Sequence, residues 1–348
     1  MMVWNKIKWL VERFLDFRRK GYPLTAMGVT LLIATVPFKC SSVVIDFPEN
    51  NYIESLELTC NDESILTIPF SIFIVLIGSL MIWFELRSFA RTTSRVLITG
   101  MPGLSSDFPM NILNRREQKL AREPVELGLV DVTNDNLSDH IDLYNAELRV
   151  DLFKRLVLHQ DCTKLYIGGL TRVPMLVAYG AFLRNVSSKV TYFDKLHKEG
   201  DWHLLNDEDA DISFSDFNFI KKPNEHGDVG LAVGFSSEIL EEQLPERYQG
   251  YTTILKPSTQ EDRNLVKNQD NLERLGMDIK RLIDQLNNSE VLRVHLFLSV
   301  QSTLAIEIGR RFQEGMHRNW VIHNFDAQSG KYSSAIELNK NGISMWAP

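Results

Sequence analysis

The residues best suited to hold a ligand lie at two turns where an apolar run gives way to a helical pattern. The turns are Gly168–Arg172 and Ser299–Thr303. Small and hydroxyl residues at a helix start leave backbone N–H groups accessible, and the positive end of the helix dipole attracts an anion. The guanidinium of Arg172 suits a phosphate directly. The candidate ligand-binding residues are Gly168, Gly169, Thr171, Arg172, Ser299, Gln301, Ser302 and Thr303.

A structural interpretation competes with this one at each hydroxyl residue. Ser302 or Thr303 taken singly is more simply explained as a helix cap, because hydroxyl side chains commonly accept a hydrogen bond from the first free N–H groups of a helix. Two equivalent turns in one chain favour a ligand instead.

Motifs for catalysis, metals and cofactors are missing from the sequence. No GxGxxG follows a strand pattern, and GMPGLSSD at 100–107 lacks the lysine and the spacing of a P-loop. The eight histidines are scattered, without HExxH, paired CxxC or GxSxG. His317 and His323 flank a probable strand and are better explained as surface or core residues than as metal ligands. The sequence therefore favours a receptor or effector without a cofactor over an enzyme.

The elements that position the two turns follow an alternating pattern from about residue 95 onward. Short apolar runs alternate with helical stretches, which predicts a largely parallel α/β sheet. Predicted strands cover 96–100, 125–132, 165–169, 190–194 and 202–206, and predicted helices cover 142–160, 171–185 and 264–286.

Part of this pattern occurs twice. Residues 294–312 repeat the order strand, small polar turn, helix of residues 164–183, and the two helices carry Gly180 and Gly309 in their second halves. A Phe-Asp pair ends the next strand in each copy, at 193–194 and at 325–326. Two related α/β units would face each other about a pseudo-two-fold axis. Chance similarity between such units is the alternative, which the coincident Phe-Asp pairs make weaker.

Two uncharged stretches precede this region. One covers the eighteen residues between Lys20 and Lys39, and the other covers the twenty-one residues between Glu63 and Glu85. A helix rises ~1.5 Å per residue, so the second stretch reaches ~32 Å and matches a hydrocarbon core of roughly 30 Å. The pattern predicts a two-span transmembrane hairpin over 21–87, ahead of the alternative of a cleaved signal peptide.

Charge sets the orientation of the hairpin. Basic residues concentrate before the first stretch and after the second, whereas the loop at 40–63 is acidic, so the N-terminus and the head are predicted to be cytoplasmic. Cys40 and Cys60 lie in the outer loop, where they pair or remain free thiols, and Cys162 lies in the head. The segment 1–20 is either an interfacial amphipathic helix or a straight extension of the first span. The net charge of −7 and the lack of a basic run exclude duplex nucleic acid as a partner.

Residues 294–312, WVIHNFD at 320–326 and YSSAIELN at 332–339 resemble the C-terminal half of SAVED domains. DVGLAVGFSSEI at 228–239, with the helix that follows, is similar to the middle of such a domain. The resemblance covers about 95–345 and implies two fused CARF-like (Rossmann-like) units, about 95–235 and 236–345. The expected fold class is therefore two N-terminal transmembrane α-helices plus a cytosolic α/β SAVED domain.

The resemblance also implies a function. SAVED domains of bacterial CBASS antiphage systems sense a cyclic oligonucleotide made by a partner nucleotidyltransferase, and the ligand drives head-to-tail assembly. Here only membrane helices are attached, so the implied output is disruption of the inner membrane and abortive infection. Ala26, Thr30 and Ala34 form a small-residue stripe suited to packing against other helices, or equally against the second span. The rival classes are a membrane-anchored phosphodiesterase that degrades the ligand, and a transporter or channel subunit.

Overall fold

The structure is a computed structural model in which the chain divides into two compact units, Met1–Arg91 and Thr92–Pro348. We call the second unit the head. The structure describes residues 43–46, 55–58, 76–80, 83, 93–100, 108–121, 124–128, 137–149, 162–184, 189–195, 201–207, 211–215, 220–286, 290–313, 315–339 and 341–347.

The described part of the N-terminal unit is small. Strand β1 (Val43–Asp46) pairs antiparallel with β2 (Ser55–Leu58), so a hairpin lies inside the loop predicted at 40–63. The predicted spans lie outside the described residues except at 76–80 and 83, and so do the segment 1–20, Cys40 and Cys60. Within the described ranges, no helix combines the length and the apolar character needed to cross a membrane.

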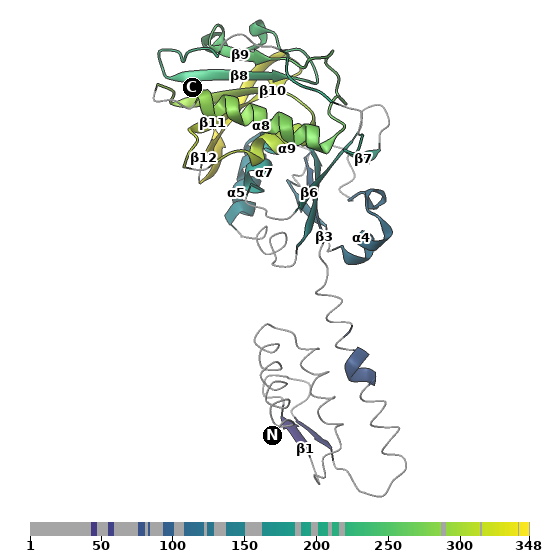
Figure 1. The fold of residues 1–348 in the computed structure, drawn as a ribbon. Helices are drawn as coiled ribbons and strands as arrows, with labels where there is room; N and C mark the ends of the chain where they lie inside the picture. Colours follow the sequence, from purple (N-terminus) through teal and green to yellow (C-terminus); the bar gives the residue numbers. More distant parts are fainter. Residues whose placement is uncertain are drawn as a thin grey trace, which may run out of the picture. The chain divides into compact units, whose positions relative to one another are not determined.

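The first half of the head is built on a five-stranded sheet of order β4-β3-β5-β6-β7. Strands β3, β6 and β7 of this sheet are labelled in Figure 1. The first four strands in this order are parallel, and β7 pairs antiparallel with β6. Its elements are β3 (Thr93–Thr99), α4 (Arg115–Leu120), β4 (Val125–Leu127), α5 (Leu137–Arg149), β5 (Lys164–Leu170), α7 (Val173–Phe182), β6 (Lys189–Lys195) and β7 (Trp202–Leu204). All seven residues of β3 are buried, as expected of a parallel strand covered on both faces.

The second half of the head is built on a six-stranded sheet of order β13-β12-β11-β10-β8-β9. Four strands are parallel, and β12 and β13 add an antiparallel edge. Its elements are β8 (Asp228–Gly234), η2 (Glu241–Gln243), η3 (Glu246–Tyr248), β9 (Thr252–Leu255), α8 (Gln269–Leu286), β10 (Arg293–Ser299), α9 (Ser302–Arg310), β11 (Asn319–Asp326), β12 (Lys331–Asn339) and β13 (Gly342–Met345). Its first strand lies N-terminal to the boundary near residue 235 that the sequence suggested.

The two halves share one topology. Counted along the chain, the first strand of each half lies between the second and the third, and the fourth and fifth strands follow beyond the third. Strand β3 therefore corresponds to β8, β5 to β10 and β6 to β11. Helix α5 occupies the place of α8 in the order of elements, and α7 occupies that of α9. The repeat therefore extends through all five strands, beyond the two segments in which the sequence showed it.

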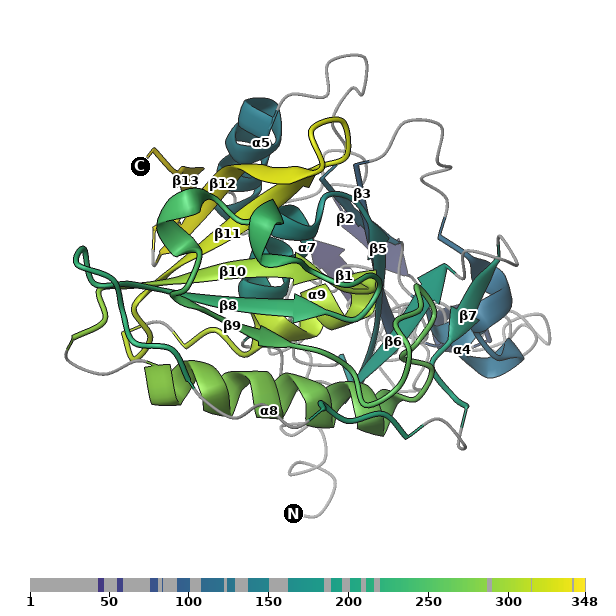
Figure 2. The ribbon, with the colours of Figure 1, turned by 90° about the horizontal axis from the view of Figure 1, so that it is seen from above.

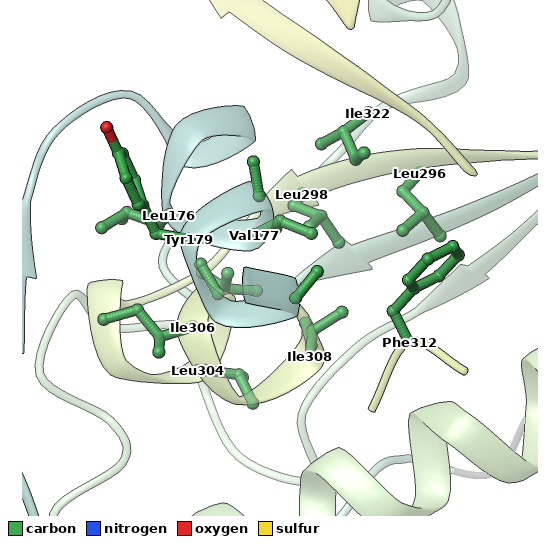
Figure 3. Close-up of a cluster of buried hydrophobic side chains, with 14 of the residues drawn as sticks. Leu176, Val177, Tyr179, Leu296, Leu298, Leu304, Ile306, Ile308, Phe312 and Ile322 are labelled. Carbon is green, nitrogen blue, oxygen red and sulfur yellow. The ribbon is translucent and has the colours of Figure 1, made fainter. Parts of the chain in front are cut away.

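Helices α7 and α9 bring the two halves together (Figure 3). A Cβ atom on Gly180 would lie 2.1 Å from the carbonyl oxygen of Ile306, and one on Gly309 would lie 2.0 Å from that of Val177. Ile306 and Val177 each stand three residues before the glycine of their own helix, so the contact is reciprocal. This reciprocity is what a pseudo-two-fold axis between the halves requires.

The helices differ in how they are buried. Residues Pro174 to Ala181 of α7 are buried without interruption, because this helix lies between the halves. By contrast, α8 is amphipathic and packs one apolar face, with Leu275 and Ile279, into the core beside the second sheet (Figure 2). A buried polar group also joins the halves: the hydroxyl of Tyr192 donates to Glu307, and Arg310 donates to that hydroxyl at 2.7 Å.

Most predicted elements are confirmed, with shifted ends. The helix predicted over 264–286 begins at Gln269, because the Asn268 side chain accepts a hydrogen bond from the Asn271 N–H at 2.9 Å and caps it. The helix predicted over 142–160 begins earlier, at Leu137, with Asp139 in its first turn. Residues 150–161 lie outside the described residues.

Candidate functional site

The strand order of each half identifies where a ligand could bind. In open α/β sheets, ligands bind outside the carboxyl ends of the strands, where the chain order reverses direction. That point lies between β3 and β5 in the first half and between β8 and β10 in the second. Both predicted turns follow the second strand of their pair, so the structure places both at such a point.

In the first half, two buried hydroxyl groups at this point are unpartnered. Thr99 ends β3 and Thr171 follows β5, and each side chain is 4% exposed. Neither hydroxyl oxygen has a hydrogen-bond partner within the part of the chain that the structure describes. A buried hydroxyl without a partner costs about 1–3 kcal/mol. A ligand that offers oxygen atoms here would recover that energy.

Gly100 brings the two strand ends together. A Cβ atom on this residue would lie 2.2 Å from the hydroxyl oxygen of Thr171 and 3.2 Å from Cε1 of the buried His140. Glycine is therefore required here by space, and the Thr171 hydroxyl and the imidazole converge on its backbone.

Helix α7 begins at the same place. Its N-cap residue is Arg172, whose own side chain does not cap the helix by a hydrogen bond. Pro174 stands in the first turn, as predicted, where its missing N–H costs nothing. The start of α7 thus combines the positive end of a helix dipole with a half-buried guanidinium and two unpartnered hydroxyls. This combination suits an anion with several acceptor oxygens.

In the second half, hydrogen bonds close the equivalent point. The loop after β8 folds over the end of β10, since the N–H groups of Phe235 and Ser236 both donate to the Ser299 carbonyl at 2.8 Å. The hydroxyl groups of Ser237 and Ser299 are 2.7 Å apart and share a hydrogen bond. The backbone and side-chain oxygens of Ser299 therefore already have partners.

The start of α9 is occupied by a carboxylate of the first half. Asp194, at the end of β6, accepts hydrogen bonds from the Thr303 hydroxyl at 2.9 Å and the Thr303 N–H at 3.4 Å. The Gln301 amide donates to the same oxygen at 3.5 Å and to the Val266 carbonyl at 3.1 Å. Burial raises the pKa of Asp194 to about 6, although these hydrogen bonds oppose the shift. Asp194 therefore acts as a built-in anion that joins the halves.

The predicted site residues consequently separate into groups. Gly168 and Gly169 lie within β5 rather than in the turn, where Cβ atoms would come within 2.4 Å of Phe193 and 2.7 Å of Ile98. Thr303 and Gln301 are buried in the contact with Asp194, and Ser302 is half-buried as the first residue of α9. Of the predicted residues, only Thr171 and Arg172 lie at a turn where hydroxyl groups have no partner within the described part of the chain.

Sequence reasoning missed Thr99, Gly100 and His140 as neighbours of this turn. The strand 96–100 was predicted, but nothing in the sequence indicates that its end meets the turn after β5. It also did not foresee the role of Asp194, although its Phe-Asp pair was noticed as a mark of the repeat. The Phe-Asp pattern predicted where Asp194 stands in the repeat. Its burial, which decides its role, results from packing between the halves.

The two histidines considered as metal ligands have other partners. His317 lies 2.9 Å from an Asp284 oxygen, and His323 is buried with its Nε2 3.0 Å from Nδ1 of His295. Burial lowers the pKa of both His323 and His295. Among the residues that the structure describes, no group of three or more His, Cys, Asp or Glu could hold a metal ion.

Comparisons with known proteins give one family match. The model of the family described as "SMODS-associated and fused to various effectors sensor domain", SAVED, matches residues 151–338. No curated protein sequence matches the chain.

Solved structures of Cap4 SAVED/CARF-domain containing receptors are similar to the chain. The Acinetobacter baumannii receptor with the cyclic trinucleotide 3'3'3'-cAAA is 15% identical, with a TM-score of 0.48, over 79% of this chain and 61% of that one. The same receptor with 2'3'3'-cAAA is 14% identical, with a TM-score of 0.47, over 79% and 60%. The Moraxella osloensis receptor is 14% identical, with a TM-score of 0.43, over 81% and 58%. The chain thus spans about three-fifths of the length of these receptors.

Proposed function

The chain belongs to the SAVED family of sensor domains, and from this premise we propose that its head binds a cyclic oligonucleotide at the start of α7. The observation that carries the proposal is a pair of buried hydroxyl groups beside the start of α7, those of Thr99 and Thr171, which have no hydrogen-bond partner among the residues that the structure describes. A phosphodiester brings a negative charge and acceptor oxygens to that point. The corresponding start of α9 already holds the carboxylate of Asp194.

Calorimetry of the full-length protein in detergent tests this site. The ligands are cyclic di-, tri- and tetranucleotides, beginning with 3'3'3'-cAAA and 2'3'3'-cAAA. Arg172→Ala removes a charge-assisted hydrogen bond and should weaken binding by about 10- to 100-fold. Ser302→Ala, at the start of α9, is the matched control and should leave the affinity unchanged. Equal affinity of the wild type and Arg172→Ala would exclude this turn.

Thr171→Val gives a second and more selective test. The change removes a buried hydroxyl that has no partner in the free protein, so it should not lower stability, yet it should weaken ligand binding. A variant that loses affinity while its unfolding midpoint stays the same or rises would support a ligand-binding role for this hydroxyl. The same incubations, analysed for linear nucleotide, test the rival phosphodiesterase activity.

The proposal extends to the N-terminal unit. Residues 21–87 form a two-span hairpin in the inner membrane, with the N-terminus and the head cytoplasmic, because their uncharged stretches are long enough to span and their flanks are basic. An impermeant thiol reagent applied to intact cells should label Cys40 and Cys60 after reduction in a Cys162→Ser variant. Labelling of a probe cysteine placed in the head would contradict this topology.

The output we propose is membrane disruption by ligand-driven assembly. A cyclic oligonucleotide supplied by a partner nucleotidyltransferase after infection promotes head-to-tail contacts, and each added copy brings two more helices into one patch of membrane. Liposomes that carry the full-length protein should leak an encapsulated dye only when the ligand is added. Replacing Ala26, Thr30 and Ala34 with leucine should preserve ligand binding and reduce leakage, because bulk prevents close helix approach. Leakage that is equal without ligand would refute the sensor role.

A further inference from the structure

Asp326 stands at the place in the second half that Asp194 occupies in the first. The two residues are the acids of the Phe-Asp pairs in the equivalent strands β11 and β6. Asp194 reaches across to the start of α9, where the Thr303 hydroxyl donates to it at 2.9 Å. The pseudo-two-fold relation therefore directs Asp326 towards the start of α7, the equivalent helix of the other half.

The side chain of Asp326 leaves β11 on the face of the sheet that α7 covers. Trp320 and Ile322 precede it at alternate positions of this strand and pack in the same core cluster as Val177 of α7. The register shift in the hairpin places its extra residue on β12, so the side chains of β11 keep alternating as far as Asp326. Helix α7 also contacts β11 directly. Strand alternation and the pseudo-two-fold relation thus agree on the direction of this carboxylate.

The N-cap residues of the two helices form the next equivalent pair. Gln301 is the N-cap of α9, and its amide donates to Asp194 at 3.5 Å. Arg172 is the N-cap of α7, so the same relation turns its guanidinium towards Asp326. A hydrogen bond from Ser329 is the largest of the causes that lower the pKa of Asp326, and the charge of Arg172 is another. A cation thus replaces a neutral amide beside the second carboxylate.

Asp326 lacks the buried donors that hold Asp194. Counted back from the matched glycines of the two helices, Thr303 of α9 corresponds to Pro174 of α7. Proline has neither an N–H nor a hydroxyl, so α7 offers neither of the hydrogen bonds that Thr303 gives to Asp194. The carboxylate of Asp326 is open to solvent and accepts from the Ser329 hydroxyl of its own turn at 2.7 Å. Another anion can therefore replace it beside α7 without breaking a buried contact.

We propose that Asp326 competes with the ligand for Arg172: the carboxylate pairs with the guanidinium in the free protein, and a phosphodiester of the cyclic oligonucleotide takes its place. This inference rests on the proposed function and adds a residue that sets the affinity of the same site. Only free protein in which the guanidinium is unpaired can bind at once, so the apparent affinity falls with that fraction. The start of α9 keeps its carboxylate, whereas the start of α7 exchanges its carboxylate for the ligand.

Calorimetry of the full-length protein in detergent tests this competition, with the cyclic di-, tri- or tetranucleotide that the wild type binds most tightly. Asp326→Asn keeps a side-chain oxygen for the hairpin turn and removes the charge, so it should bind about 2- to 5-fold more tightly at low salt. The gain should shrink as salt is added, because salt screens exposed charges. Glu225→Gln is the matched control and should leave the affinity unchanged, since this exposed acid precedes β8 at the opposite end of the parallel strands.

A double variant tests whether the gain depends on Arg172. In an Arg172→Ala background, Asp326→Asn should give no further gain, because the group for which carboxylate and phosphate compete is absent. An equal gain in that background would overturn the pairing and indicate general repulsion of the ligand. Unchanged or weaker binding by Asp326→Asn alone would also overturn the inference while leaving the proposed function intact, and weaker binding would indicate that the carboxylate contacts the ligand. A wild type that binds none of these nucleotides would overturn both proposals.

Discussion

The two halves of the head offer the same turn and use it differently. In the second half, the start of α9 receives the Asp194 carboxylate, and hydrogen bonds to Ser299 close the end of β10. In the first half, the Arg172 side chain does not cap α7, and the hydroxyls of Thr99 and Thr171 beside it have no partner among the residues that the structure describes. Because the five equivalent strands have the same order in both halves, a few side chains account for the difference between the two turns.

The difference shows what a duplicated domain can do with two equivalent sites. Asp194 belongs to the first half and caps a helix of the second, so one site supplies part of the contact between the halves. The equivalent Asp326 instead accepts hydrogen bonds within its own hairpin turn. One copy of the repeat thus contributes to the contact between the halves, and the other is where we propose that the ligand binds.

The largest losses of stability should come from changes at the contact between α7 and α9, which is alike in the two halves. Gly180→Ala and Gly309→Ala each place a Cβ about 2 Å from a carbonyl oxygen of the partner helix, so the helices must separate. Overpacking usually costs about 1–3 kcal/mol, and a clash with backbone should reach or exceed the upper end. Chemical denaturation of the head should show similar losses for the two variants. Tolerance of one change but not the other would contradict the reciprocal crossing.

The next largest loss of stability should distinguish the two Phe-Asp pairs. Asp194→Ala leaves the N–H and the hydroxyl of Thr303 without their buried acceptor, and should lower the free energy of unfolding by about 2–4 kcal/mol. Asp326→Ala is the matched control at the equivalent strand end, and should cost much less, because the carboxylate and the turn hydrogen bonds that it accepts are exposed. Equal losses in both variants would show that the pairs have not diverged.

The pH dependence of stability should report the same carboxylate. Burial raises the pKa of Asp194 to about 6 in the folded state, above the ordinary value of 3.8. The folded state then holds the proton more tightly, so this group contributes stability below pH ~4 that is lost as the pH rises to ~6. The wild type should lose about 1–3 kcal/mol across this window relative to Asp194→Asn, which has no titrating carboxyl. A constant difference between the two proteins would contradict the assignment.

Local patterns were enough to predict the strands and helices around the two turns and the repeat that relates them. Gly180 and Gly309 could be paired because a helix glycine stands out in sequence. The sequence could not predict which of the two turns receives a carboxylate from the other half, since Asp194 and Asp326 both follow a phenylalanine and differ only in burial. Thr99 was invisible as a neighbour of Thr171 because some seventy residues separate them and only the sheet order brings them together.

The smallest effect should come from Ser299, which the sequence placed among the ligand-binding residues. Its hydroxyl shares a hydrogen bond with Ser237, and its carbonyl accepts from Phe235 and Ser236, so the residue holds the loop after β8. Ser299→Ala keeps the backbone bonds and removes one exposed side-chain bond, for a loss of about 0.5–1.5 kcal/mol at most. Ligand affinity should stay within about twofold of the wild type, in contrast to the loss expected for Thr171→Val. A tenfold loss of affinity in Ser299→Ala would mean that both turns contact the ligand, and that the closed turn opens when the ligand binds.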